Sequence, residues 1–415
     1  MAGLFENPFR TAPGSDPPAF VGRDQELAIA RFAAGMTRSG APTAPVIITG
    51  LRGMGKTALL RRAMADARAD KAIVVYAEAT RREPFGAVLR AGLESAQESI
   101  GSLPDKLKRT IEKVIRVLPK AEYELPDGAG AIALSGASEP DQKPFMTVLR
   151  ELSTQAWKHG RYLVFAIDEI QEAQINDLSP LVRFIHETAG TAQPALIVGA
   201  GLPNSRDHLY KAHTYTERWR YLDIGLLTSD QTREAIAKPI RDAGQAISHH
   251  GLDALVAESA GYPFFIQEYA SAAWMQHQGK TITSEDVAAV LPGVRRILET
   301  SLYDSRFRAL TPRECAYVLV LADLGPGPRT VHEIADRLGS DSERVSSIRN
   351  QLVKKDVLFV PSGGMVEFRI PLSDRYVQAH RTELERRAAA KPSVSIDRGR
   401  EPSPSEAGKS RKHRA

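Results

Sequence analysis

The chain is poor in cysteine: among its 415 residues Cys315 is the only one. A single thiol excludes a disulfide framework and a cysteine-based zinc site, and this usage is typical of a reducing compartment, so we expect a cytoplasmic location. Long hydrophobic runs are also missing. None approaches the ~20 residues needed to cross a bilayer, which predicts no membrane partner. The first 20 residues lack a basic start followed by an apolar core, so no secretory signal is expected.

A strong net charge is lacking too, since the formal charge is only +5. Residues 391–415 hold seven Lys/Arg against three acids, so +4 of that charge lies in the last 25 residues. The bulk charge therefore does not mark the folded part as nucleic-acid-binding. The Pro, Ser and Gly content predicts a disordered basic tail over 386–415. It is either a solvated tail or an electrostatic arm for nucleic acid or membrane.

What the chain does have is a set of five short apolar runs, separated by helical patterns. Near-continuous apolar runs suit a parallel sheet that is buried on both faces. Their alternation with helices predicts an α/β, doubly wound domain. The expected strands are 46–49, 71–79, 161–169, 195–201 and 220–225.

Composition divides the rest of the chain. The proline-rich start, 1–19, predicts an extended arm, and 100–143 interrupts the α/β pattern as a flexible insertion within 20–227. The strands stop after 228, and helical patterns follow over 229–243, 251–260, 262–278 and 284–291, which predicts a helical domain over 228–300.

A third folded region is expected over 301–385. Three capping boxes occur in sequence, "TPRE" at 311–314, "TVHE" at 330–333 and "SDSE" at 340–343, each predicting a helix start. Two short strands around a Gly-Gly turn follow over 357–370. Three helices and a β-hairpin predict a winged helix-turn-helix.

The clearest motif is "GLRGMGKT", which matches G-x-x-x-x-G-K-[ST] between an expected strand and an expected helix. The glycines let backbone amides curl around phosphate oxygens, the lysine adds a positive charge, and the threonine hydroxyl binds magnesium. The pattern predicts an ATP site with Mg²⁺. The residues assigned to nucleotide binding are Gly50, Gly53, Met54, Gly55, Lys56, Thr57 and Ala58, with Lys56 also catalytic and Thr57 also a metal ligand.

A second motif, which is acidic, supplies a metal ligand and a group that can activate water. "YLVFAIDEIQ" ends an apolar strand in Asp168 and Glu169. We expect Asp168 to hold the metal and Glu169 to orient and polarise the attacking water. The alternative reading is a plain acidic helix start. Together with the loop, the pair predicts slow ATP hydrolysis to ADP and phosphate.

These motifs resemble those of AAA+/STAND-type P-loop ATPases, and more closely bacterial relatives of the origin-recognition initiator and archaeal-type ATPases. The resemblance implies a five-stranded core, a helical lid over 228–300 and a C-terminal winged helix. "FVGRDQEL" at 20–27 is similar to the family segment beside the adenine, which would place Val21, Gly22 and Arg23 there or at the domain seam. The same segment also reads as a helix start capped by Asp24.

The resemblance implies two further contacts. In "TYTERWRYLDIG" Arg218, or else Arg220, would reach the γ-phosphate of a neighbouring subunit, which implies a homo-oligomer on ATP binding. In "GYPFF" at 261–265, Pro263 would pack on the nucleotide. The family's polar sensor after the fourth strand is not matched, because Asn204 comes a few residues late.

The leading interpretation is an ATP-binding, Mg-dependent ATPase that acts as a nucleotide-controlled switch, with the winged helix as output or clamp. Two alternatives stay open. One is a DNA-binding initiator or loader whose helix from about 341, with Arg344 and Arg349, enters double-stranded DNA. The other is a signalling or defence scaffold that oligomerises on ATP and does not bind DNA.

Overall fold

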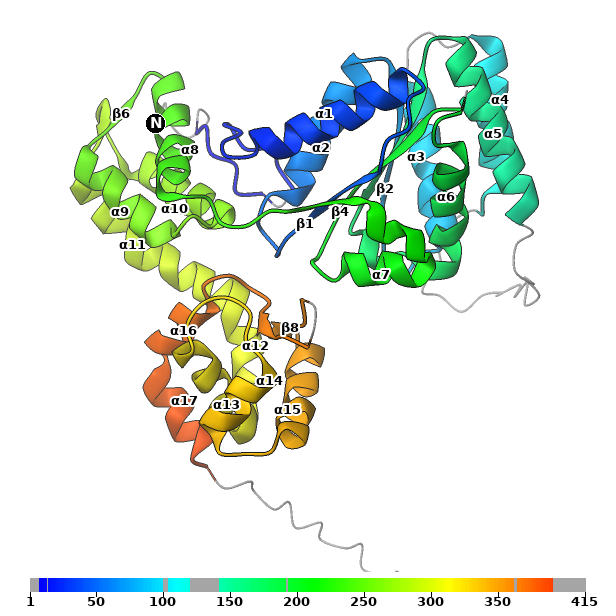
Figure 1. Ribbon diagram of the computed structural model, residues 1–415. Coiled ribbons are helices and arrows are strands. Elements are labelled where there is room, and N and C mark those ends of the chain that lie inside the picture. The colour runs from blue at the N-terminus through cyan, green and yellow to red at the C-terminus, as the bar shows by residue number, and fades with distance from the viewer. Residues whose placement is uncertain are drawn as a thin grey trace, which may run out of the picture.

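The computed structural model describes residues 7–12, 14–99, 104–119, 142–191, 193–361 and 364–390. Figure 1 shows an α/β region, a group of helices beside it, and a C-terminal helical region below both. A membrane-crossing helix would need to be long and apolar, and none in these described ranges is both.

The α/β region is built on a sheet of five parallel strands in the order β2-β3-β4-β1-β5. The order confirms the predicted parallel core and brings the loops that follow β1, β3 and β4 to one edge of the sheet. The strands are β1 Val46–Thr49, β2 Ala72–Glu78, β3 Tyr162–Asp168, β4 Ala195–Gly201 and β5 Arg220–Asp223.

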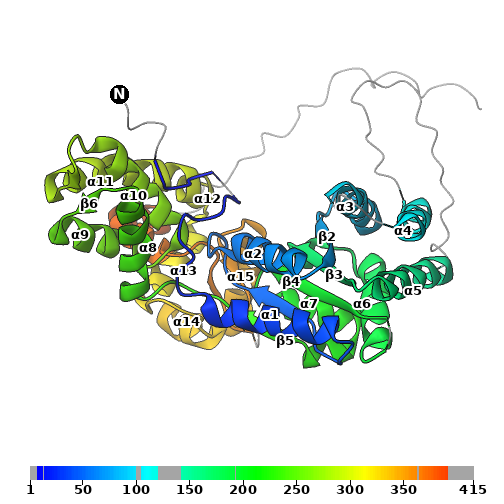
Figure 2. The same cartoon turned by 90° about the horizontal axis from the view of Figure 1, so that it is seen from above.

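Both faces of this sheet are buried, which is why its strands are apolar throughout. Val46 and Ile48 pack into one hydrophobic cluster, while Ile47 between them packs into the other. Seen from above, α3, α4 and α5 lie on the side of the sheet away from α1 (Figure 2). The helices are α1 Asp24–Arg38, α2 Lys56–Ala69, α3 Phe85–Ser99, α4 Asp105–Val117, α5 Gln142–Lys158, α6 Ile175–Thr188 and α7 Ser205–Ala212, with 3₁₀ turns η1 Ile170–Glu172 and η2 Thr214–Arg218.

Part of the expected flexible insertion over 100–143 is a packed helix, at a stretch whose sequence also allows a helix. Helix α4 occupies this stretch and packs against α5, with Leu107, Ile111 and Val114 fully buried. Three apolar side chains at helical spacing give the segment a face that only burial satisfies. The part of the expected insertion over 120–141 lies outside the described residues.

The helical group beside the core follows the predicted pattern closely. It comprises α8 Ser229–Asp242, α9 His249–Ser259, α10 Pro263–Gln276 and α11 Ser284–Leu298. Capping boxes start α8 at Thr228 and α11 at Thr283. The expectation that strands stop after 228 is wrong in detail, because β6 Ala246–Ile247 and β7 Thr281–Ile282 pair as a two-residue ladder.

The N-terminal segment lies on this helical group. Phe9 is buried, and the Asn7 amide donates to the hydroxyl of Ser271 in α10. The backbone amide of Arg10 donates to the side chain of Gln267 on the same helix. These contacts tie the segment to α10 before the chain enters the α/β region.

The C-terminal region opens with a π-helical turn, η3 Glu299–Asp304, and α12 Ser305–Arg308. Capping boxes open α13 at Thr311 and α14 at Thr330, as predicted. The third expected box is wrong: Asp341, not Ser340, caps α15 by accepting from the amide of Arg344. The elements are α13 Pro312–Asp323, α14 Val331–Leu338, α15 Ser342–Lys354, and the antiparallel pair β8 Leu358–Phe359 and β9 Glu367–Phe368.

Two further helices follow, α16 Ser373–Ala379 and α17 Arg381–Ala388. The expected tail boundary at 386 is therefore wrong by three residues. The Arg387 guanidinium donates to the carbonyls of Phe307, Arg308 and Leu310, which anchors the last turn of α17 to the end of α12. The rest of the expected tail, from 391, lies outside the described residues.

Candidate functional site: the phosphate-binding loop and its neighbours

The loop after β1 has the backbone of an anion-binding site. Gly53 and Gly55 have φ of 73° and 86°, a region that side chains rarely adopt. Gly55 caps α2, and the free amides and positive dipole end of that helix face the loop. A curled loop of amides before a helix N-terminus is a binding site for phosphate oxygens.

Lys56 lies over this loop and is only 6% exposed. Its ammonium group donates to the carbonyl of Leu51 at 2.9 Å. Burial lowers the pKa of Lys56, and the carboxylates of Glu169 and Asp168 act in the opposite direction. The ammonium therefore lies between the loop and the acidic pair, where it can bind a phosphate oxygen.

Asp168, the last residue of β3, lies beside Thr57, the second residue of α2. The carboxylate is 3% exposed, accepts a hydrogen bond from the Thr57 hydroxyl and accepts the amide of Glu169 at 2.9 Å. Burial raises the pKa of Asp168, and the hydrogen bond from Thr57 partly offsets this. A carboxylate and a hydroxyl in contact are the oxygen donors that Mg²⁺ takes together with nucleotide phosphates, so these residues fit the ion.

Among the described residues there is no group of three or more His, Cys, Asp and Glu side chains placed to hold a metal by themselves. A magnesium ion here would depend on Thr57, Asp168 and the phosphates of the nucleotide.

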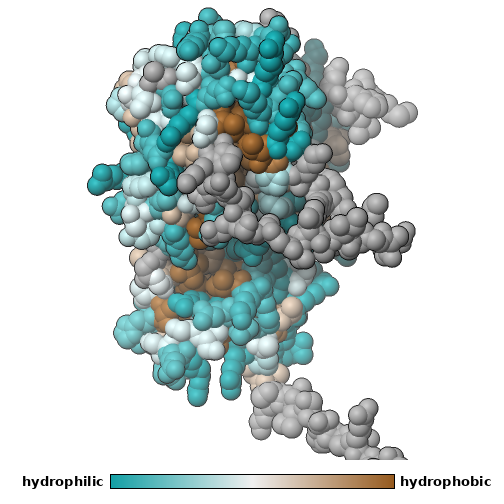
Figure 3. Space-filling model, turned by 90° about the vertical axis from the view of Figure 1, so that its right-hand side faces the viewer, coloured by the Kyte–Doolittle hydropathy of each residue, from teal (hydrophilic) through white to brown (hydrophobic). Residues whose placement is uncertain are grey.

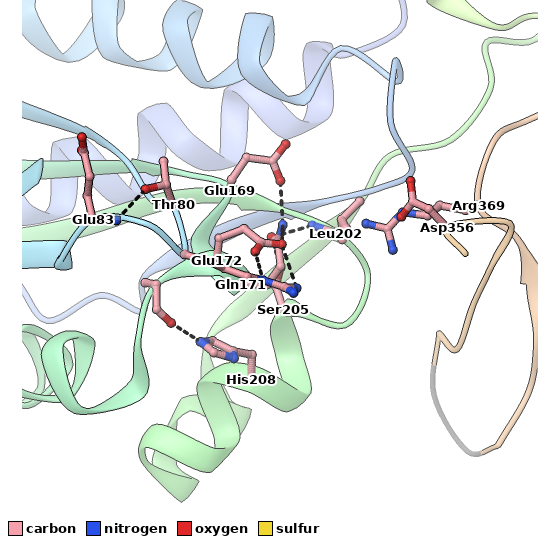
Figure 4. A network of polar contacts seen from close by, with 12 residues as sticks. Thr80, Glu83, Glu169, Gln171, Glu172, Leu202, Ser205, His208, Asp356 and Arg369 are labelled. Carbon is pink, nitrogen blue, oxygen red and sulfur yellow. Dashed lines mark hydrogen bonds and ion pairs between the residues drawn. The ribbon is translucent and has the colours of Figure 1, made fainter. Parts of the chain in front are cut away.

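Glu169 follows Asp168 with a left-handed backbone, φ 47°. Figure 4 shows its carboxylate bonded to Gln171, whose side-chain amide donates to Glu169 Oε2 at 2.6 Å. Gln171 was not identified from the sequence, although it stands two residues after the acidic pair. Its carbonyl in turn accepts from the segment after β4.

The predicted adenine segment lies at the seam of three elements. The Arg23 guanidinium donates to the carbonyl of Gly225 at 2.5 Å and to that of Met54 at 3.4 Å, joining the loop to the chain that leaves β5. Gly22 has φ 69°, and a side chain there would collide with Gln231 of α8. Val21 is partly buried against the core. Helix α1 begins at Asp24 without a side-chain capping bond, so Asp24 is not a cap.

Tyr262, which the sequence reasoning missed, links the helical group to the loop. Its ring is 2% exposed, and its hydroxyl donates to the carbonyl of Arg52 at 3.0 Å. A side chain on Gly53 would collide with this ring. The adjacent Pro263 is the first residue of α10. The signal available in the sequence was an aromatic residue inside the Gly-x-Pro motif.

The two candidate finger arginines are not brought to this loop. Arg218 and Arg220 are exposed at the amino end of β5, and β5 runs parallel to β1, so they lie at the opposite edge of the sheet. Arg220 lies over the ring of Phe32, 5.5 Å from its centroid. Asn204 is exposed before α7, whereas Ser205 is buried and donates to Gln171.

A cation from the C-terminal region instead acts on the loop lysine through its charge. Arg369, just after β9, is 15% exposed at its side chain and forms an ion pair with Asp356 at 2.8 Å. Burial lowers the pKa of Arg369, and Asp356, Glu172 and Glu169 oppose that shift. Its charge also contributes to the lowered pKa of Lys56. Figure 4 shows Arg369 and Asp356 next to each other.

An open cavity of about 790 Å³ separates the α/β region from the C-terminal region next to the loop. Figure 3 shows apolar residues gathered in the hollow between these two parts. The cavity is lined from the core by Gly50, Leu51, Met54 and Ile224 and from the C-terminal region by Phe359, Phe368, Ile370 and Leu372.

Comparisons with known proteins agree with this geometry. Residues 19–198 match the model of the AAA ATPase domain, and residues 300–377 match a domain of unknown function (DUF8462). The structure is similar to a Walker-type ATPase of Pyrococcus abyssi, with 14% identity and a TM-score of 0.52 over 89% of this chain and 99% of that one. At this identity the similarity shows a shared fold.

Two other solved structures are similar at lower scores. Orc1 of Aeropyrum pernix, solved in complex with DNA, has 16% identity and a TM-score of 0.46 over 91% of this chain and 97% of that one. A RuvB mutant of Thermotoga maritima has 14% identity and a TM-score of 0.44 over 86% and 95%. No curated protein matches the chain.

The fold and the loop define a P-loop protein of the α/β class. More specifically, residues 19–198 match the AAA ATPase domain model, and the resemblance to AAA+ P-loop ATPases that the motifs predicted is confirmed. Proteins of this class use a nucleotide, usually with Mg²⁺.

Proposed function

We propose that the protein binds ATP with Mg²⁺, hydrolyses it slowly and uses the bound nucleotide as a switch between two arrangements of its parts. The observation that carries the proposal is the convergence of Lys56, Thr57, Asp168 and Glu169 at the edge where β1 and β3 end. The alternative interpretations, a plain glycine-rich turn and a plain acidic helix start, do not explain why these four groups lie together.

Each group has a role in phosphoryl transfer. Loop amides and Lys56 would hold the phosphates, and Thr57 and Asp168 would hold Mg²⁺, which neutralises charge that develops on them. Glu169 would orient the water that attacks the γ-phosphate. Its carboxylate is close enough to Lys56 to act against the lowering of the lysine pKa, as expected of a group at the phosphate end of the site.

The switch would act through one contact with the loop and one charge that acts on it. The helices α8–α11, proposed as the lid, contact the loop through Tyr262, and the charge of Arg369 in the C-terminal region contributes to the lowered pKa of Lys56. A triphosphate adds negative charge between Lys56 and Arg369, and so favours a closed arrangement that ADP holds less strongly.

We propose that residues 301–385 are a winged helix that acts as a clamp inside this switch. Of the basic residues on α15 and just after it, Lys355 is occupied by Glu314 at 2.6 Å, and Arg349 is bonded to Asn350. The Lys355 ion pair supports an internal contact, whereas the bond of Arg349 to the adjacent residue is exposed. Arg344 and Lys354 are exposed, so duplex DNA affinity is measured as well.

The proposal extends to a homo-oligomer on ATP. Arg218 is exposed and lies at the sheet edge opposite the loop of its own chain, so it would act only on a neighbouring subunit. The hydrolysis rate per subunit, measured at high and at low protein concentration, tests this role. It should rise with concentration, because an arginine that acts on a neighbouring subunit contributes only in the assembly.

The test of the function compares three proteins. Wild type should bind ATP and release phosphate with a Mg²⁺ requirement. Lys56→Ala should lose nucleotide binding, while Glu169→Gln should keep ATP bound and lose turnover. Normal hydrolysis by Glu169→Gln would overturn the base assignment, and unchanged affinity in Lys56→Ala would overturn the phosphate loop.

The same proteins separate the output alternatives. Duplex DNA affinity is measured at two salt concentrations, with a slowly hydrolysed ATP analogue and with ADP. Binding that depends on the nucleotide and falls with salt would make the C-terminal region a DNA output domain. No binding in either state is the expected result for an internal clamp.

A further inference from the structure

Gln171 is buried at 8% exposure in the 3₁₀ turn η1, and its side chain bridges two segments of the site. Its carbonyl oxygen accepts the backbone amide of Leu202 at 3.0 Å and the Ser205 hydroxyl at 3.2 Å. Because the Leu202 amide can only donate, the oxygen of Gln171 must face it. The Gln171 NH₂ group is thereby directed at the carboxylates.

That NH₂ group donates to Glu169 Oε2 at 2.6 Å and lies 3.5 Å from Glu172 Oε1. A donor to an ionised acceptor makes a stronger hydrogen bond than a neutral pair. Glu169 also has a left-handed backbone, which is unfavourable for a non-glycine residue and persists only where the surroundings enforce it. Gln171 is the side chain that bonds the Glu169 carboxylate in this position (Figure 4).

The end of β4 is shaped to receive Gln171. A side chain at Gly201 would collide with both the Gln171 oxygen and the Ser205 hydroxyl. Gly201 therefore leaves the space that lets Gln171 reach the backbone after β4. This residue thus links the carboxylate of the β3 end to the segment from which α7 begins.

We propose that Gln171 is a positioning residue: it holds Glu169 in the orientation for water attack and ties that orientation to the segment 202–205 after β4. The inference rests on the proposed function, since it assumes that Glu169 orients the water. Oxygen Oε2 is held by Gln171, which leaves Oε1 as the atom that would contact the water. A base whose direction is set by a third group follows the general logic of oriented acid–base pairs.

Two substitutions separate the bond that Gln171 donates to Glu169 from the bonds that it accepts from Leu202 and Ser205. Gln171→Glu keeps an oxygen for Leu202 and Ser205, but loses the donor to Glu169 and adds a like charge beside it. Gln171→Met has a similar length and loses both kinds of bond. Gln193→Met is the matched control, because Gln193 donates to Thr154 on the far side of the α/β region.

The measurements are kcat and KM for ATP, affinity for a slowly hydrolysed ATP analogue, and melting temperature. We expect both Gln171 variants to lower kcat by about tenfold or more, with KM and analogue affinity changed less than about threefold. Gln171→Glu should stay folded because it keeps the bonds to the segment after β4, although the added buried charge should lower its melting temperature. Gln193→Met should match wild-type kcat.

A merely structural anchor predicts otherwise, since Gln171→Glu retains the bonds to the segment after β4. Wild-type kcat in Gln171→Glu, with Glu169→Gln inactive, would overturn the positioning role and leave the proposed function intact. Wild-type hydrolysis in Glu169→Gln would overturn the proposed function itself. If Gln171→Met does not fold, Gln171→Glu and the control still decide the question.

Discussion

Tyr262 donates its phenolic hydrogen to the carbonyl of Arg52, so a residue of the helical group α8–α11 contacts the loop that would hold the phosphates. The ring also fills the space next to Gly53. The helical group and the loop, 210 residues apart in the sequence at this contact, are therefore joined by one partly buried hydrogen bond and one close packing contact.

Tyr262→Phe should uncouple the two without emptying the core. The ring stays, while the Arg52 carbonyl loses its buried donor, which should lower the free energy of unfolding by about 1 kcal/mol. The rise in melting temperature on adding ATP analogue should be smaller than in wild type. The reason is that the hydrogen bond between the helical group and the loop is lost. Tyr210→Phe, at an exposed position, is the control and should change neither quantity. An unaltered nucleotide response in Tyr262→Phe would contradict this coupling.

Gly53→Ala should damage the loop specifically. The backbone has φ 73° and the added methyl group meets the Tyr262 ring, so both strain and collision oppose the native loop. We expect ATP affinity to fall by at least about tenfold, as roughly 1–2 kcal/mol of loop distortion implies. Equilibrium binding of a labelled ATP analogue checks this.

A glycine elsewhere provides the comparison. Gly293 lies inside α11, and a methyl group there meets nothing within 4 Å. Gly293→Ala should therefore raise the free energy of unfolding, by up to about 1 kcal/mol, with ATP affinity unchanged. Equal loss of affinity in both variants would show that the effect at Gly53 is not a property of the loop.

Arg369→Met should weaken binding of ATP more than binding of ADP. The variant keeps the aliphatic part of the side chain and leaves Asp356 paired with Arg306 at 3.3 Å. Losing one cation near the phosphates should cost about tenfold in ATP affinity. Titration calorimetry with ATP analogue and ADP measures the difference. Arg381→Met, also in the C-terminal region but paired with Asp323, should leave the two affinities unchanged. Equal loss for both nucleotides would remove Arg369 from any sensing role.

The C-terminal region should also lose stability in strong acid through one ion pair. Asp323 in α13 accepts bonds from Arg381 and Gln378, which lowers its pKa to about 2. A carboxylate whose pKa is depressed by folding contributes stability above its unfolded pKa of ~3.9, and this is lost as the pH falls through 2. Asp323→Asn should therefore be less stable than wild type at pH 7 and equal to it near pH 1.5, by denaturant melts at both values. A constant difference across this range would contradict the linkage.

The site residues divide by how far apart in the sequence their partners are. Short-range patterns predicted the phosphate loop, Gly50 to Thr57, and the pair Asp168–Glu169. These patterns are an apolar strand, a turn that needs glycine, and a helix start. Gln171, Tyr262 and Arg369 were missed, because each acquires its role from a partner that the sequence does not place nearby, namely Leu202, Arg52 and the charges around Lys56.

The sequence by itself determined the parallel sheet, the capped starts of α13 and α14 and the position of the phosphate loop. The reason is that burial pattern, capping and backbone strain act over a few neighbouring residues. Only the tertiary structure decided that α4 packs in the core, that α17 continues past 385, and which side chains bond with the loop and with Glu169. Those outcomes depend on contacts between distant segments, whose free energies arise only when the folded elements meet.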